Sequence, residues 1–493
     1  MTAKGRTKAG AAYLASLTRE GPMKKPRLIA AGAAALWLAG CAAVQRPPEH
    51  TAPVAQPQWH APLPHNGTLA DLSAWWAQFD DPLLIELVEA AQAANPTIAS
   101  AASRIRQARA ARVAAGAALL PTLDASASAA RGNAQPPAPL AATVQAGLQT
   151  AWEIDLFGGN RAAAEAAQAR LEGARAGWHA ARVSVAAETA NSYMTLRTCE
   201  QQLAVAANDA KSRAETSRLS ALSARAGFTA PATSALARAS AAEASARATQ
   251  QRALCDLEVK ALVALTAMPE PGLRGKLAAG WTDRSLAAAL AVASVPAQVL
   301  AQRPDVFQAE SEVAAASAEV GSARADRFPR LTLSGSIAAG SVRTGGVTTD
   351  LQTWSIGPVA VTLPIFDGGR RAANVDAAQA RYEEAAALYA ARVRQAVREV
   401  EEALVNLESA RLRTDDARVA LEGYRASFTA TDARYRGGLA SLVELEDARR
   451  TALAAETAWV ALQRERVAAW IALYRAMGGG WARPATAMAT TQP

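Results

Sequence analysis

The sequence predicts a mainly α-helical protein made of two similar halves, with a small β-sheet that has one apolar and one polar face. Short motifs recur at a nearly constant offset: Asn95-Pro96 returns as Arg303-Pro304, 208 residues later, and the turn residue Gly227 returns as Gly438, 211 residues later. Stretches with apolar residues at every second position also occur in both halves, between long stretches without proline. Repeats of this length are duplicated subdomains rather than solenoid units, and such a pseudo-symmetric chain excludes most enzyme architectures.

Composition favours long helices that pack closely. The chain is 51% hydrophobic but only 5% aromatic, because most of its apolar residues are alanine, which has the highest helix propensity and little bulk. Seven lysines and arginines and one glutamate give residues 1–40 a net charge of +6, which leaves +2 of the chain's +8 for the rest. This remainder lacks the basic excess of nucleic-acid-binding proteins.

The N-terminal leader has the pattern of an exported lipoprotein. The charged stretch Met23–Arg27 precedes an apolar run, Leu28–Leu38, that is too short to span a bilayer and suits a signal peptide. The run ends in Leu38-Ala39-Gly40-Cys41, which resembles a bacterial lipobox with Cys41 as the lipidated first residue. Ala42, in place of an aspartate, favours sorting to the outer membrane. The alternative is an ordinary secretory cleavage site beside a chance cysteine.

The first structural repeat is predicted over residues 71–290, behind a proline-rich lipidated tether at 41–70. Two helices come first, and the second has proline at its favoured first position. Alternating residues then predict strands at about 121–131 and 143–157. A proline-free helix of about 66 residues, or about 100 Å, follows and reverses at 227–231 into a return helix.

The second structural repeat, residues 291–480, is predicted to contain the same elements in the same order. Its strands are expected at about 330–340 and 352–366, where Pro358 and Pro364 indicate an edge strand or a bulge. Its long helix is expected to reverse at 436–441, and residues 481–493 are expected to form a flexible tail.

Cys199 and Cys255 are the only cysteines after Cys41. An even number of cysteines in an exported chain favours a disulfide. If the helix before the 227–231 turn packs against the helix after it, residues equally distant from the turn lie side by side, and Cys199 and Cys255 meet this condition. Two buried thiols are the alternative.

Four strands in one chain are too few to close a barrel in a membrane. Open sheet edges in lipid leave backbone groups without hydrogen bonds, and transmembrane barrels use at least about eight strands. Copies of the chain must therefore pool their strands. A trimer would supply about 12, enough for an open lumen, whereas a dimer would supply about eight, which side chains would nearly fill.

Several motifs together resemble those of the TolC/OprM-type outer-membrane efflux proteins, in particular the lipoprotein (NodT-like) branch that serves RND-type efflux systems. Their order and spacing over about residues 70–480 carry the resemblance: Trp75-Trp76, Glu153–Gly158, Gln302–Val306, Ala323–Leu331 and Leu363–Arg371.

This resemblance implies a homotrimer whose 12-stranded outer-membrane β-barrel continues into a 12-helix periplasmic α-barrel. It also implies partners, namely a periplasmic adaptor (membrane fusion) protein and an inner-membrane pump, and a passive exit duct for small toxic molecules or drugs. It implies no enzyme activity and no cofactor. Two other functions stay open: the outer-membrane duct of a type I protein secretion system, and a periplasmic coiled-coil lipoprotein that forms no channel.

The candidate functional residues lie at the two helical hairpin turns. By resemblance, Val443 and Asp447, which share one helix face, would form the apolar and acidic rings of a periplasmic gate. Glu444 and Glu446 would be neighbouring acids able to replace Asp447. Tyr435 and Arg436 would hold the shut state through hydrogen bonds. The alternative is that these acids are solvated charges paired with neighbouring arginines. The first half has a leucine where the second has Asp447, so an acidic ring would come from the second hairpin only.

The tips themselves would contact the adaptor, and the residues expected there are Gly227, Phe228, Gly437 and Gly438. The sequence shows no catalytic constellation. Its four histidines have no cysteine or carboxylate at metal-ligand spacing. The Gly158-Gly159 pair superficially resembles a phosphate loop, but its counterpart Gly368-Gly369 indicates a turn from strand to helix.

Overall fold

The computed structural model describes residues 46–50, 75–76, 79–133, 139–278, 300, 302–481 and 483. The chain divides into two units, residues 1–45 and residues 46–493, and every described residue belongs to the second unit. The leader, the lipidation site Cys41, most of the predicted tether 41–70 and nearly all of the predicted tail 481–493 therefore lie outside the described residues.

A helix of the same length precedes the first strand of each half. Helix α3 spans Pro96–Ala117 and helix α8 spans Pro304–Ala325, 22 residues each, and proline occupies the first position of both. Helix α2, Pro82–Ala94, precedes α3, and the side chain of Asp81 caps it by accepting hydrogen bonds from the backbone of Leu83 and Leu84.

A single antiparallel sheet contains the four strands in the order β1-β2-β3-β4. The strands span Thr122–Gly132, Ala141–Ile154, Arg330–Thr344 and Val347–Thr362. The predicted strands 143–157 and 352–366 both end earlier, because Asp155 and Asp367 leave the sheet to cap the next helix. Strands β3 and β4 extend further toward each other than predicted, because Gly345 and Gly346, both with positive φ, turn the chain in two residues.

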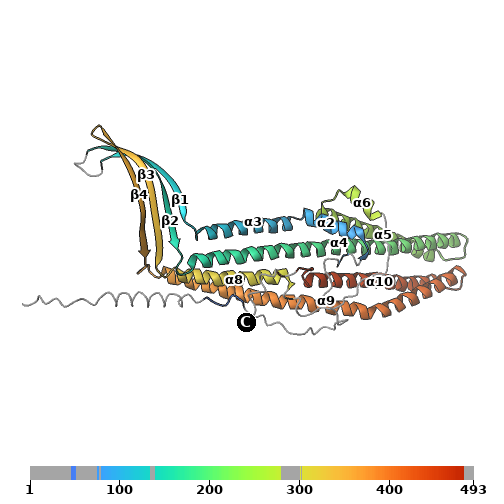
Figure 1. Ribbon diagram of the computed structural model, residues 1–493. Coiled ribbons are helices and arrows are strands. Elements are labelled where there is room, and N and C mark those ends of the chain that lie inside the picture. The colour runs from blue at the N-terminus through green and yellow to red at the C-terminus, as the bar shows by residue number, and fades with distance from the viewer. Residues whose placement is uncertain are drawn as a thin grey trace, which may run out of the picture. The chain divides into compact units, whose positions relative to one another are not determined.

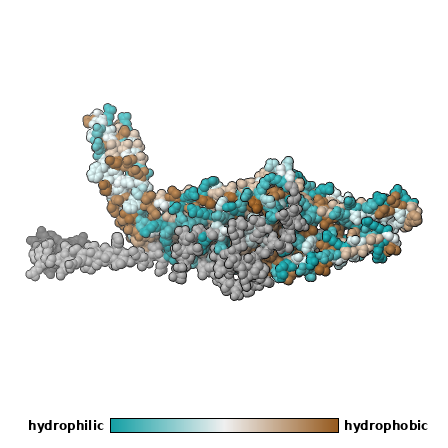
Figure 2. Space-filling view, turned by 45° about the vertical axis from the view of Figure 1, so that its right-hand side comes forward, coloured by the Kyte–Doolittle hydropathy of each residue, from teal (hydrophilic) through white to brown (hydrophobic). Residues whose placement is uncertain are grey.

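One face of this sheet is apolar and uncovered. Val144, Leu148 and Trp152 project from β2 on the same side, and Ile337 lies opposite Leu148 on β3. Val144 is 58% exposed, although it belongs to a regular strand. The other face of β2 carries polar residues, among them Gln149. Figure 2 shows this apolar surface on the strands and hydrophilic surface gathered along the helices.

Two helices of 67 residues each form the body of this unit. Helix α4 spans Gly159–Arg225 and helix α9 spans Arg370–Arg436, each about 100 Å long. They return as α5, Pro231–Thr266, and α10, Leu442–Ala476. The sheet lies at one end of the helices and both hairpin turns at the other (Figure 1). A short helix that the sequence did not predict, α6, Glu270–Ala278, follows α5. None of the described helices is both long and apolar enough to cross a bilayer.

The main hydrophobic core lies where α2 packs on the long helices. Trp75 and Trp470 stack with their ring centroids 4.1 Å apart, and the Tyr193 hydroxyl donates a hydrogen bond of 2.5 Å to Asp81. Cys199 and Cys255 lie in this core, and the structure joins them by a disulfide that links α4 to α5.

Arg303 organises the start of the second half. Its buried guanidinium donates to Asp305 at 2.7 Å, to Glu399 of α9 at 2.8 Å and to the carbonyl oxygen of Ala476 in α10 at 3.0 Å. Burial disfavours the charged form of Asp305, but the hydrogen bond and charge of Arg303 outweigh it and lower the pKa of Asp305. Gly478, at φ +81°, passes so close to the backbone of residue 302 that an added Cβ would lie 2.9 Å from its oxygen.

Candidate functional site at the hairpin tips

Both hairpins reverse through a glycine in the left-handed region. Gly227 has φ +79° and Gly438 has φ +73°, so a side chain at either position would strain the backbone. Gly437 has φ −81°, a value open to any residue, so the second turn depends on Gly438. Next to these glycines, Phe228 is 85% exposed and Leu439 is 73% exposed. The tips therefore present uncovered apolar side chains in a single copy.

Val443 and Asp447 lie on the exposed surface of α10, close to its N-terminus. Val443 is 67% exposed. The Asp447 carboxylate makes an ion pair with Arg450 of the same helix, which is the alternative that the sequence left open. An exposed pair of this kind contributes only about 0–1 kcal/mol, so it leaves Asp447 able to take another partner. The gate role of both residues stays a prediction.

Glu444 has a structural role at the start of α10. Its carboxylate accepts from the backbone N–H of Ser441 at 2.7 Å, while the Ser441 hydroxyl accepts from the backbone N–H of Glu444 at 3.2 Å. This reciprocal capping box lowers the pKa of Glu444, chiefly through the backbone hydrogen bond from Ser441. The Glu444 carboxylate is thus engaged in capping the N-terminus of α10.

Tyr435 and Arg436 behave differently from each other. The Tyr435 hydroxyl lies 3.0 Å from the Ser220 hydroxyl of α4, so it joins the second hairpin to the first. Tyr435 also packs on a small buried cluster that contains Leu445. Arg436 pairs with Asp432 of its own helix at 2.8 Å. Among the described residues it reaches the first hairpin only through its charge: the pKa of Glu215 of α4 is lowered chiefly by a hydrogen bond from Arg218, and the charge of Arg436 adds to this effect.

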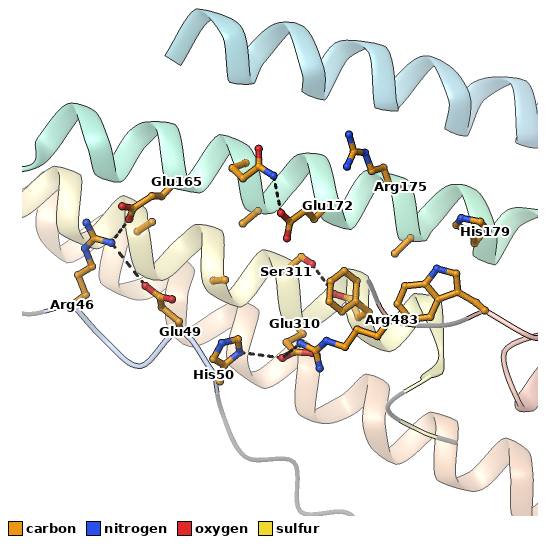
Figure 3. A pocket seen from close by; sticks show the side chains of 17 residues that line it. Arg46, Glu49, His50, Glu165, Glu172, Arg175, His179, Glu310, Ser311 and Arg483 are labelled. Atoms are coloured by element: carbon orange, nitrogen blue, oxygen red, sulfur yellow. Dashed lines mark hydrogen bonds and ion pairs between the residues drawn. The ribbon is translucent and has the colours of Figure 1, made fainter. Parts of the chain in front are cut away.

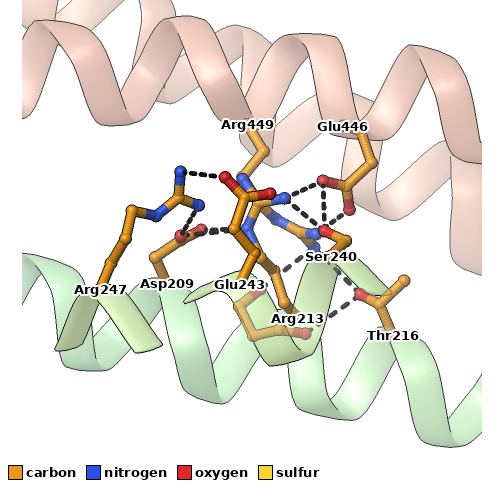
Figure 4. A network of polar contacts seen from close by, with 9 residues as sticks. Asp209, Arg213, Thr216, Ser240, Glu243, Arg247, Glu446 and Arg449 are labelled. Carbon is orange, nitrogen blue, oxygen red and sulfur yellow. Dashed lines mark hydrogen bonds and ion pairs between the residues drawn. The ribbon is translucent and has the colours of Figure 1, made fainter. Parts of the chain in front are cut away.

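A larger polar network joins the two hairpins further from the tip (Figure 4). Glu446 of α10 accepts from Arg213 of α4, from Arg449 of its own helix and from the Ser240 hydroxyl of α5. Arg213 also pairs with Asp209, 2.9 Å away on α4. Three helices of one copy therefore meet around a single carboxylate.

Arg449 is the most buried charge of this network. It is 3% exposed, and its guanidinium donates to the Thr216 hydroxyl at 3.0 Å and to the Ser212 hydroxyl at 3.2 Å. Burial lowers the pKa of Arg449, although the nearby Glu446 acts in the opposite direction. An arginine stays charged in proteins, so this charge depends on the hydroxyls and on Glu446 for compensation.

Sequence reasoning missed this network. In the sequence, Arg449 is only one of the neighbouring arginines that could pair with the gate acids. The pairs Asp209–Arg213 and Glu446–Arg449 have helical spacing and are visible in the sequence. Nothing in the sequence shows that the two pairs lie face to face.

A second cluster lies near the other end of α4 and α8, where residues 46–50 pack on the helices (Figure 3). The carbonyl oxygens of Pro47 and Pro48 accept from the Ser317 hydroxyl at 2.6 Å and from the Tyr382 hydroxyl at 2.9 Å. Arg46 pairs with Glu165 of α4. Its side chain occupies the space in which a Cβ on Gly321 would lie.

Two residues from opposite terminal regions of the chain contact Glu310 in this cluster. His50 Nδ1 lies 3.0 Å from one carboxylate oxygen of Glu310, and Arg483 lies 2.8 Å from the same oxygen. The segment after the predicted lipidation site is thus held by α4, α8 and α9 of its own chain. Among the described residues, no group of three or more His, Cys, Asp or Glu side chains is placed to hold a metal ion.

Comparison with known proteins identifies the family. Residues 87–267 and 295–479 match the family model described as Outer membrane efflux protein. The chain belongs to the outer membrane efflux protein family. This membership makes it an outer-membrane component of an efflux system, in agreement with the resemblance seen in the sequence motifs.

Relatives and solved structures agree with this assignment over nearly the whole chain. The chain is 30% identical to the pyoverdine export outer membrane protein OpmQ of Pseudomonas aeruginosa, over 93% of this chain and 97% of the relative. It is 31% identical to the outer membrane protein OprJ of the same species, with the same coverage. The outer-membrane channel OprN matches its fold with a TM-score of 0.79 and 30% identity, over 89% of this chain and 99% of that structure.

Proposed function

We propose that three copies of this outer membrane efflux protein form a passive exit duct for small toxic molecules or drugs. The observation that carries the proposal is the sheet, in which four strands have two open edges, β1 and β4, and an uncovered apolar face. Lipid does not tolerate open strand edges, so the edges must pair with other copies.

Three copies account for the strands and the helices together. They supply about 12 strands, which close around an open lumen, whereas two copies supply about eight, whose interior side chains fill. The helices α3, α4, α8 and α9 continue from the ends of the strands, so the same three copies would surround the lumen with helices below the sheet. The acylated Cys41 would anchor each copy in the outer membrane, since stable anchoring needs more than one acyl chain.

The hairpin tips are proposed to meet a periplasmic adaptor that links the duct to an inner-membrane pump. The exposed Phe228 and Leu439 offer apolar contacts to such a partner. Small molecules are favoured as cargo over secreted proteins because the relative OpmQ is named for export of pyoverdine. The duct of a type I secretion system stays the second candidate, and the genes encoding the adaptor and pump would distinguish the two.

Two measurements on the detergent-extracted protein test the proposal. Mass and low-resolution shape are expected to show a trimer more than about 100 Å tall, because helices of 67 residues reach that length. Reconstitution in a planar bilayer is expected to give ion conductance. A stable water-soluble monomer, or a trimer that never conducts, would contradict the duct, and the latter result would favour a coiled-coil lipoprotein.

A further inference from the structure

The internal duplication supplies a template for the contact between copies, provided that the proposed trimer is correct. Helices α3 and α8 correspond with an offset of 208 residues, and α4 and α9 correspond with an offset of 211, with no difference in helix length. Within one chain α4 packs on α8. In a closed ring with pseudo-symmetric halves, the matching contact is α9 of one copy on α3 of the next. We call this contact the α9–α3 seam.

The template contact has an acidic flank on α4. Glu165 and Glu172 line one pocket together with Ala314 of α8 (Figure 3). Glu165 takes its cation from outside both helices, because Arg46 of the tether pairs with it, while Arg175 of α4 also lines the pocket. The residue after Arg46 is held by Ser317 of α8. Helix α8 lines this pocket with Phe307, Glu310 and small side chains, and none of its residues there is a cation.

The α9–α3 seam keeps the acidic positions of α4 but replaces two small residues of α8 by larger, charged ones. At the positions that match Glu165 and Glu172, α9 carries acids again, Asp376 and Glu383. At the positions that match the alanine and the serine of α8, α3 carries Arg106 and Arg109. At these positions the seam therefore has cations on α3, whereas the template has none on α8 and Glu165 pairs with the tether instead.

Among the described residues, these four charges have no ion-pair partner in their own copy. All four side chains belong to exposed residues. In the described part of the chain, Arg106 donates only to the hydroxyl of Ser103 at 2.9 Å, and Glu383 accepts only from the amide of Gln379 at 3.3 Å. Neither Arg109 nor Asp376 has a partner there. Helix α3 contains four arginines and no acid, so its free edge is uniformly positive.

We propose that copies of this chain recognise one another through the α9–α3 seam, where Arg106 pairs with Glu383 and Arg109 pairs with Asp376 of the next copy. The two pairs lie seven residues apart on α9, which is two helical turns, and three residues apart on α3. Long arginine side chains bridge this difference in spacing. The pairs set the register between copies, and they oppose a partner that slides along the edge.

The opposite flank of the seam differs from the template. In the template, Arg170 of α4 pairs with Glu312 at 3.0 Å and with Glu319 at 2.6 Å, and the seam has Ala111 at the position of Glu319. The other two matching positions of the seam hold arginines, Arg381 and Arg104, which would repel each other. Glu384 stands where α4 has a glycine, three residues after Arg381, and offers a carboxylate to both arginines. The replacement of a glutamate on α8 by an arginine on α3 is thus accompanied by a new glutamate on α9.

Cysteine pairs test the register directly in the full-length, membrane-extracted protein. With Arg106→Cys and Glu383→Cys in the same chain, mild oxidation is expected to yield a covalent trimer in denaturing gels that reducing agent returns to monomer. The matched control combines Arg106→Cys with Glu402→Cys, an exposed position 19 residues, or about 28 Å, further along α9. This control is expected to stay monomeric in the same gel.

Charge reversal tests the pairing. Arg106→Glu with Arg109→Glu is expected to raise the protein concentration at which half of the trimer dissociates by about tenfold or more, because like charges replace opposite ones in all three seams. Asp376→Arg with Glu383→Arg is expected to do the same, and the four changes together are expected to restore the trimer. The control Arg175→Glu reverses an exposed arginine of α4 and is expected to have little effect.

The outcomes separate this inference from the proposed duct. A wild-type trimer that forms no covalent trimer with the first cysteine pair, or that tolerates both reversals, would overturn the seam and leave the duct standing. A wild-type protein that is monomeric at every concentration would overturn both. Reversals that weaken the trimer but are not rescued by combination would also overturn the pairing.

Discussion

Replacing Glu446 with glutamine is expected to loosen the contact between the two helical hairpins of one copy. This carboxylate compensates Arg213 and Arg449, whose side chains are both nearly buried. Glutamine has a similar shape and can still accept hydrogen bonds, so the change removes the negative charge and little else. Arg213 keeps Asp209 as a hydrogen-bonded anionic partner, whereas the hydrogen bonds that Arg449 keeps go to hydroxyls. The ring of Phe428, 5.5 Å away, and the more distant charges of Asp209 and Asp432 compensate Arg449 in part.

The structure sets the size of the effect. Removing one partner of a fully buried ion pair costs about 3–5 kcal/mol. The Glu446 side chain is 20% exposed, so water compensates part of the loss, and about 2–3 kcal/mol is expected. Because the network joins the hairpins without holding the rest of the chain, this cost should appear as easier local opening of α4 against α10.

Hydrogen exchange of backbone amides measures this opening. Amides of α4 and α10 near the network are expected to exchange about 30- to 150-fold faster in Glu446→Gln, while amides around Trp470 stay unchanged. The control is Glu465→Gln, which breaks a pair with Arg413 between α9 and α10 whose side chains are both more than half exposed. This control should change exchange by no more than about twofold, since exposed pairs contribute little.

The reasoning would be refuted if Glu446→Gln and Glu465→Gln had the same small effect. That result would mean that the buried arginines do not depend on the carboxylate. Faster exchange throughout the chain would also contradict it, because the network would then support the whole fold rather than the contact between hairpins.

Three further changes should have distinct effects. Gly438→Asp is expected to abolish export from cells while leaving the oligomer intact, because it strains a turn at φ +73° and adds charge at the adaptor-facing tip. Replacing both Cys199 and Cys255 with serine is expected to destabilise the protein by about 4 kcal/mol in thermal unfolding, given the 56-residue separation. Lowering the pH to about 4 and below should remove the stability that Asp305 supplies. Although burial opposes it, Arg303 lowers the pKa of Asp305 in the folded protein. The contribution of Asp305 is therefore present above its unfolded pKa of about 3.9 and is lost as the pH falls through its folded pKa.

Each of these predictions has a contradicting result. Export by Gly438→Asp at the wild-type level would mean that the tip does not dock, and Gly423→Asp, on an open face of α9, is the matched control. If a reducing agent lowered the melting temperature of the doubly substituted protein as much as that of the wild type, the loss of stability would not come from the disulfide between residues 199 and 255. For the acid-dependent loss, Asp305→Asn should flatten the pH profile, and an unchanged profile would contradict the assignment.

The duplication made much of the architecture predictable from sequence. Proline and glycine landmarks at offsets of 208 and 211 residues appear as helices of equal length in the two halves, because these residues begin and end helices through local backbone geometry. Alternation of apolar residues located the strands for the same reason. Their ends were less accurate: Asp155 belongs by pattern to the predicted strand but accepts a hydrogen bond from the backbone of the next helix, and β4 ends at Thr362, two residues before Pro364.

The candidate site was predictable only in part. The glycine turns and the exposed Val443 follow from local sequence, but the capping role of Glu444 was missed although its partner Ser441 lies three residues earlier, at capping-box spacing. The network around Glu446 depends on how α10 is rotated against α4. Such rotation results from the packing of many small side chains, which no short pattern in an alanine-rich helix specifies.

The disulfide makes the two hairpins mechanically unequal. Helices α4 and α5 are covalently fastened part-way along their length, so neither can slide past the other. The second half of the chain contains no cysteine, and α9 and α10 are joined only by their turn and by noncovalent packing. Sliding of one helix along the other is therefore blocked within the first hairpin by a covalent bond, whereas in the second hairpin only the turn and the packing of α9 on α10 oppose it.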